Sequence, residues 1–60
     1  MKARELIKLL ESNGFVFVRQ TGSHAIYKKT GMQIIVVPIH SKDIPKGTLQ
    51  GILKDANISI

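Results

Sequence analysis

The stretch from Phe15 to Pro38 constrains the fold most, because two turn signals divide strand-forming residues into three runs. The turn signals are Thr21-Gly22-Ser23 and Lys29-Thr30-Gly31, combinations of glycine with serine or threonine that are typical of tight turns. The strands predicted between and around them are residues 15–20, 24–28 and 32–37. Turns this short join neighbouring strands directly, so we expect a three-stranded antiparallel meander. Pro38 closes the third strand, because proline has no N–H to donate to a further ladder bond.

Helical periodicity lies on both sides of these strands. Residues 2–13 carry an apolar stripe at the spacing of one helix face, namely Ala3, Leu6, Ile7 and Leu10. Gly14 suits the left-handed position that ends such a helix. A second stripe, Leu49, Ile52, Leu53 and Ala56, predicts a last helix that begins between Ile44 and Gly47 with Asp43 as its cap. Gly51 within this helix indicates close packing or contact there.

The predicted order is therefore α-β-β-β-α, an α+β fold in one 60-residue domain, residues 1–60. Both helices must bury their stripes on the same face of the sheet, which leaves the other face open. This is the element order of the double-stranded RNA-binding domain (dsRBD). Alternation places His24, Ile26 and Lys28 on one face of the second strand and Ala25, Tyr27 and Lys29 on the other. The strands are too apolar for alternation to tell which face is buried.

Charge indicates the class of partner. Nine Lys and Arg against four Asp and Glu give a net charge of +5, which favours nucleic acid, or else an acidic protein or membrane surface. The absence of cysteine excludes a disulfide framework and a thiolate zinc site. No apolar run approaches the ~20 residues of a membrane span, and no signal-peptide core is present, so we expect a cytoplasmic protein without a membrane partner. A chain this small is not expected to hold a cofactor.

The meander brings distant polar residues to one end of the sheet. If the second and third strands form a tight hairpin about residues 29–32, His24 lies opposite Val37, and His40 lies beyond the same end near Thr21 and Gly22. The last helix starts at this end, and the free N–H groups of residues 46–48 form a natural phosphate site. Positive charge around this site is expected from Arg19, Lys28, Lys42 and Lys46.

Two histidines beside an anion site suit metal-free cleavage of RNA. A base takes the proton of a 2′-hydroxyl, that oxygen attacks the adjacent phosphorus, and an acid protonates the leaving 5′-oxygen. The alternatives without a functional role are that His24 is an exposed turn residue and that His40 is a solvated loop residue. Ser23 and His24 do not form a triad, because sequence neighbours on a strand point to opposite faces. Asp43 with the two histidines lacks a recognised spacing for metal ligands, so no metal site is predicted.

Taken together, these segments resemble the HicA toxins, small mRNA interferases of HicA–HicB toxin–antitoxin pairs. The resemblance covers nearly the whole chain and rests on Glu5-Leu6-Ile7-Lys8-Leu9-Leu10, Asn13-Gly14-Phe15, Val18-Arg19-Gln20, Gly22-Ser23-His24, Val36-Val37-Pro38 with His40, and Lys46-Gly47-Thr48-Leu49 followed by Ile52-Leu53. It implies a dsRBD-like fold, ribonuclease activity on mRNA and neutralisation by a HicB-like antitoxin. It also implies that His24 is the catalytic residue, and it assigns no comparable role to His40.

The sequence thus predicts a metal-independent endoribonuclease toxin with catalytic His24. The residues expected to contact RNA are Arg19, Gly22, Ser23, Lys28, His40, Lys42 and Lys46. The alternative is a non-catalytic RNA-binding module with the same fold and the same basic surface.

Overall fold

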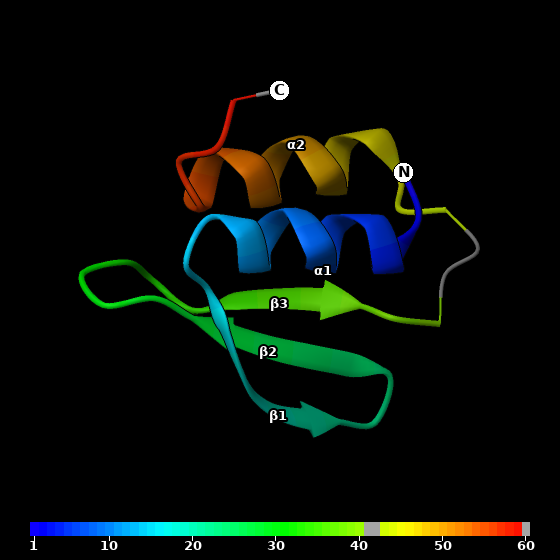
Figure 1. Cartoon of the computed structure of the whole chain (residues 1–60). Helices are drawn as coiled ribbons and strands as arrows, with labels where there is room; N and C mark the ends of the chain where they lie inside the picture. The colour runs from blue at the N-terminus through cyan, green and yellow to red at the C-terminus, as the bar shows by residue number, and fades with distance from the viewer. Residues whose placement is uncertain (41–42, 60) are drawn as a thin grey trace.

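The computed structural model describes residues 1–40 and 43–59 and contains the five elements that the sequence predicts. In chain order they are α1 (Ala3–Ser12), β1 (Val16–Thr21), β2 (His24–Lys28), β3 (Ile35–Pro38) and α2 (Lys46–Asp55). The strands form one antiparallel sheet in the order β1-β2-β3, and both helices lie on the same side of it (Figure 1). The predicted α+β fold with an α-β-β-β-α order is confirmed.

Both helices end at residues in the left-handed region. Gly14 has a φ of +90°, and the N–H of Phe15 donates to the carbonyl of Leu10 at 3.0 Å, which together form a Schellman ending. Gly14 therefore ends α1 as predicted, and it turns the chain so that Phe15 enters the core. Asn57, at a φ of +58°, has the same role after α2.

The start of α2 differs from the prediction. The helix begins at Lys46, inside the predicted window, but Pro45 occupies the N-cap and no side chain hydrogen-bonds there. The predicted cap, Asp43, is wrong because it lies two residues too early to reach the first turn. Its carboxylate instead lies 3.9 Å from the amino group of Met1. The close contact predicted at Gly51 is also wrong, since a Cβ at this position would meet no atom within 4 Å.

The β1–β2 hairpin has a two-residue loop of Gly22 and Ser23 between the paired residues Thr21 and His24. Gly22 has a φ of +58° in the first loop position, where a type II′ turn requires glycine-like freedom. The register shifts between Phe17 and Arg19, so β1 contains a β-bulge at its middle.

The β2–β3 register corrects the prediction by one residue. His24 pairs with Pro38, whereas Val37 pairs with Ala25. The third strand begins at Ile35 and not at residue 32, because the turn closed by the N–H of Met32 and the carbonyl of Lys29 is followed by unpaired chain. Since side chains alternate between faces, this one-residue change moves the partner of His24 from the buried face to the other face.

The core lies between the sheet and the helices. Its buried members are Ala3, Leu6, Leu10, Phe15, Ala25, Tyr27, Ile35, Val37, Ile44, Ile52, Leu53 and Ala56. Both predicted stripes therefore face the core, with Ile7 and Leu49 half-buried at its margin. Ala25 and Tyr27 mark the helix-covered face of β2. Burial raises the pKa of the Tyr27 phenol, and the charge of Glu11 adds to the rise.

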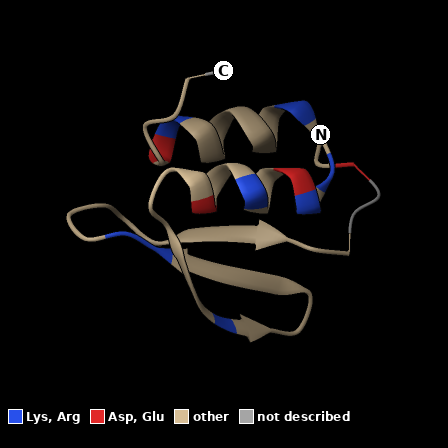
Figure 2. Cartoon of the chain, in the orientation of Figure 1, with Lys and Arg blue, Asp and Glu red and all other residues tan. Residues whose placement is uncertain are grey.

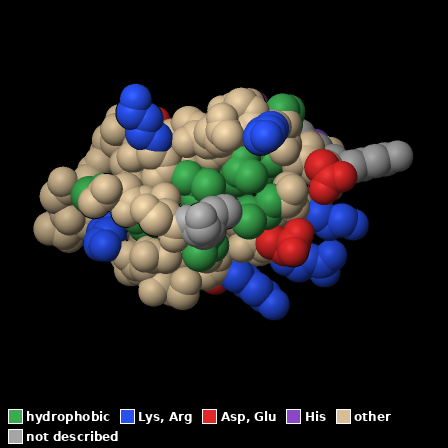
Figure 3. All heavy atoms as spheres, turned by 90° about the horizontal axis from the view of Figure 1, so that it is seen from above, with side chains coloured by type: hydrophobic (Ala, Val, Ile, Leu, Met, Phe, Trp, Pro, Cys, Tyr) green, Lys and Arg blue, Asp and Glu red, His purple; other side chains and the backbone are tan. Residues whose placement is uncertain are grey.

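The second face of the sheet is uncovered, as predicted. His24 and Lys28 are exposed on it and Ile26 is half-buried. Acidic residues lie on or beside the two helices, while the sheet carries only Lys and Arg (Figure 2). Seen from the helix side, apolar side chains gather in the middle of the surface and charged ones lie around its rim (Figure 3). Within the part of the chain that the structure describes, no helix is long and apolar enough to cross a membrane.

Candidate active site

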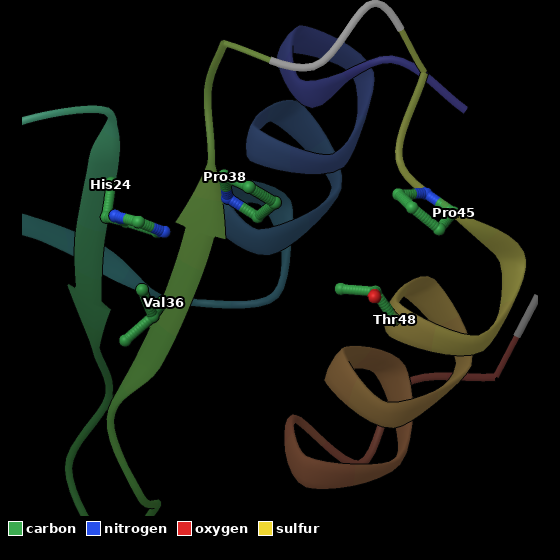
Figure 4. A pocket seen from close by; sticks show the side chains of 5 residues that line it. All are labelled: His24, Val36, Pro38, Pro45 and Thr48. Carbon is green, nitrogen blue, oxygen red and sulfur yellow. The ribbon is translucent and has the colours of Figure 1, made fainter.

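An open cleft of about 390 Å³ lies between one end of the sheet and the start of α2 (Figure 4). The residues that line it come from β2, β3 and the first turn of α2, and they are His24, Val36, Pro38, Pro45 and Thr48. The sequence predicted that the histidine and the start of the last helix would meet. The structure brings both to this one cleft.

His24 is the first residue of β2 and stands on the open face of the sheet. It is cross-strand partner to Thr21 on one side and to Pro38 on the other, so its backbone is fixed from both sides. The pairing continues past β3, where the N–H of Ile39 donates to the carbonyl of Ser23 at 2.8 Å. The imidazole points from β2 toward β3 and remains exposed (Figure 4). A rigid strand thus presents an imidazole that solvent can reach.

The opposite wall of the cleft is the beginning of α2. Thr48 directs its side chain toward β3, and Pro45 stands above it at the helix N-cap (Figure 4). The first N–H groups of a helix have no intrahelical acceptor, and this end of the helix carries partial positive charge. Lys46, exposed in the same turn, adds a full positive charge. The cleft therefore has a proton-exchanging group on one wall and a positively charged wall facing it.

The other residues predicted to contact RNA are distributed unevenly. Gly22 and Ser23 form the turn directly before His24, and Arg19 pairs with Ile26 on the same face of the sheet. Lys28 is at the far end of β2, about 13 Å from His24 at ~3.3 Å per residue. His40 follows Ile39 at the His24 end of the sheet and is exposed, but it does not line the cleft. Lys42 lies outside the described residues.

Four of the lining residues were not predicted to contribute a side chain to the site: Val36, Pro38, Pro45 and Thr48. For Thr48 the sequence predicted only a backbone N–H at the phosphate site. Thr48 is the one with a hydroxyl, which can donate to a phosphate oxygen. Its position in the first helical turn was the signal that could have identified it. For Val36 and Pro38 no such local signal exists, because their place depends on the β2–β3 register. Pro45 lines the cleft because it is the N-cap of α2.

A metal-binding arrangement is not seen in the described ranges 1–40 and 43–59. They contain no group of three or more His, Cys, Asp and Glu side chains able to hold an ion.

Comparison with known proteins identifies a family. The family model described as the HicA toxin of bacterial toxin–antitoxin systems matches residues 3–58. One chain of a solved toxin–antitoxin complex from Streptococcus pneumoniae is 32% identical in sequence, with a TM-score of 0.87. The alignment covers 97% of this chain and 98% of that one. A search of curated proteins found no match.

Proposed function

Since the chain belongs to the HicA family of toxins from bacterial toxin–antitoxin systems, we propose that it is an endoribonuclease. It cleaves mRNA in the cleft beside His24 without a metal ion, and an antitoxin protein silences it. One observation carries the proposal: an exposed imidazole on a fixed strand faces the positively charged start of α2 across the cleft.

The reaction follows from these two walls. The scissile phosphate lies at the α2 wall, where the first-turn N–H groups, the Thr48 hydroxyl and Lys46 attract its oxygens. Neutral His24 takes the proton of the adjacent 2′-hydroxyl, and that oxygen attacks phosphorus. The bond to the 5′-oxygen breaks, and this oxygen receives a proton from the imidazolium or from water. The products are a 2′,3′-cyclic phosphate and a free 5′-hydroxyl.

The substrate itself supplies the nucleophile, so the reaction needs no metal-bound water. Charge on the phosphorane is stabilised by donors that are already oriented, which is the most effective form of electrostatic catalysis. DNA has no 2′-hydroxyl and is spared. Arg19 and the Gly22-Ser23 turn lie on the approach to His24 and guide the RNA backbone.

An antitoxin partner is supported by two observations. The similar chain from Streptococcus pneumoniae was solved in a toxin–antitoxin complex. This chain carries a net charge of +5 with an open cleft, so an acidic HicB-like protein laid over the cleft would exclude RNA sterically and electrostatically.

The test is His24→Ala, with His40→Ala as the matched control because both histidines are exposed and only His24 lines the cleft. Loss of a general acid–base group lowers the rate by about 10²–10⁴-fold, so His24→Ala should neither arrest growth nor cleave mRNA, while His40→Ala does both. Circular dichroism and thermal unfolding should show a fold as stable as that of the parent chain.

The chemical groups at the ends of the cleaved RNA test the mechanism. Cleavage should persist in EDTA, give cyclic-phosphate ends, and fail on a substrate with a 2′-deoxy sugar at the scissile position. Wild-type cleavage by folded His24→Ala protein would refute the catalytic assignment. RNA binding without cleavage by the parent chain would favour the non-catalytic binding module instead.

A further inference from the structure

The edge strand β1 carries a run of exposed apolar side chains outside the cleft. All six of its residues are exposed. Val16, Phe17 and Val18 follow one another with 62%, 54% and 50% of their surface accessible. The strand is the edge of the sheet farthest from both helices, and among the described residues it pairs with β2 alone (Figure 1). Its outer edge therefore combines apolar side chains with unpaired backbone N–H and C=O groups, a combination that proteins normally avoid.

A stable protein partner needs more contact area than the cleft offers, and β1 can provide it. A specific protein complex buries about 800 Å² on each partner, close to a fifth of this chain's 4157 Å² surface. The five residues that line the cleft cannot supply such an area. Val36 lines the cleft and pairs with Ile26, which in turn pairs with Arg19, so the uncovered face continues from the cleft across β2 to β1.

Charge and side-chain type indicate what covers this surface. No Asp or Glu occurs between Glu11 and Asp43, so all the charged side chains of the sheet are positive (Figure 2). Arg19 stands within β1 itself. The patch is mainly aliphatic and provides little surface for stacking bases, which favours a protein over RNA. In a dimer formed through this edge, two chains that each carry a net charge of +5 would repel each other, and the two Arg19 side chains would lie close together. An acidic protein fits best.

We propose that the antitoxin adds a β-strand to the free edge of β1, extending the sheet to four strands. The inference rests on the proposed function, because it assumes the antitoxin partner. Main-chain bonds to β1 supply affinity, and alternate side chains of the added strand supply specificity. Its apolar side chains cover Phe17, whose ring already packs edge-on against Tyr27 at 5.7 Å. Its acidic side chains meet Arg19.

The test uses Val16→Lys and Val18→Lys, with Ile34→Lys as the matched control. Ile34 is a β-branched residue with 57% exposure that precedes β3, at the opposite edge of the sheet. None of the three belongs to the proposed catalytic machinery, so each variant should arrest growth as the parent does. When the antitoxin encoded beside the toxin gene is co-expressed, the β1 variants should escape neutralisation. Their complexes should dissociate at least tenfold faster, whereas Ile34→Lys remains neutralised.

Amide exchange on the parent complex is the second measurement. Antitoxin binding should slow exchange in residues 16–20 as well as around His24. Protection around His24 with no change in 16–20, together with normal neutralisation of both β1 variants, would overturn strand addition and leave the proposed function standing. Absence of toxicity in the parent would instead refute the proposed function.

Two further results would identify another occupant and overturn the proposal. Loss of RNA cleavage by Val18→Lys without antitoxin would mean that RNA runs along β1. A dimer of the isolated chain that Val18→Lys dissociates would mean that a second copy covers the edge.

Discussion

The two faces of the sheet use the same kinds of residue for opposite purposes. Along β3, Ile35 and Val37 point to the helices and are 2% and 0% exposed, while Val36 between them is 45% exposed. On the covered face, such residues form the core. On the open face, Val36 lines the cleft beside His24. Apolar character alone therefore does not identify the core of so small a chain, because the open face of the sheet also carries apolar residues.

The largest expected effect comes from truncating adjacent isoleucines on the two sides of this division. Ile35→Ala leaves a cavity in the core and should cost about 2–5 kcal/mol, comparable to the few kcal/mol that stabilise a domain of this size. Ile34→Ala, at a 57% exposed residue, should change the free energy of unfolding by less than about 0.5 kcal/mol. Urea unfolding measures both, and equal losses would contradict the division into covered and open residues.

A smaller effect is expected where the helix layer joins the sheet. Gly14→Ala would place a residue with a side chain at a φ of +90°, with its Cβ 3.3 Å from the Cε of Lys29. The left-handed conformation costs about 1–2 kcal/mol, so this variant should be destabilised. Gly51→Ala, in open space on α2, should instead stabilise the chain by up to ~1 kcal/mol. Thermal unfolding of the two variants should shift in opposite directions. An unchanged or raised melting temperature for Gly14→Ala would show that a side chain does not strain the backbone there.

Salt dependence separates the charges of the open face from those of the helix layer. Arg19→Gln removes a cation from the open face of the sheet, so the slope of log affinity against log salt should fall by about 0.7 for single-stranded RNA. Between 50 and 200 mM salt this is about a threefold difference in affinity. Lys54→Gln, in the last turn of α2, should leave the slope unchanged. Binding to a non-cleavable 2′-deoxy substrate measures both, and a reversed order would place RNA on the helix side.

The smallest effect concerns pH and the covered face. Because burial raises the pKa of Tyr27, the folded state holds the phenolic proton more tightly than the unfolded chain does. The resulting stability is fully present below the unfolded pKa of about 10 and is lost as pH rises through the folded pKa. The free energies of unfolding of the parent and of Tyr27→Phe should differ by a constant amount from pH 8 to about pH 10. Above about pH 10 the parent should lose stability relative to Tyr27→Phe. A constant difference throughout would mean that Tyr27 is not desolvated.

The helices and turns were predictable because their signals are local. The stripe from Ala3 to Leu10 specifies one helix face, and Gly14 ends that helix in the conformation that glycine permits. β2 has the predicted bounds because the Gly22-Ser23 turn and the second turn limit it on both sides. The predicted cap at Asp43 was wrong because an N-cap must directly precede the first helical residue. The helix begins at Lys46, so Pro45 holds that position.

The sequence by itself determined the order of the elements, the antiparallel meander and the presence of His24 beside a tight turn. Only the tertiary structure decided which of Ile34, Ile35, Val36 and Val37 enter the core, and that His24 pairs with Pro38. The physical reason is that a strand has a side-chain period of two, so an error of one residue in a loop exchanges the two faces. In an unbroken apolar run no polar residue marks the correct face, and the packing of α1 and α2 makes the choice.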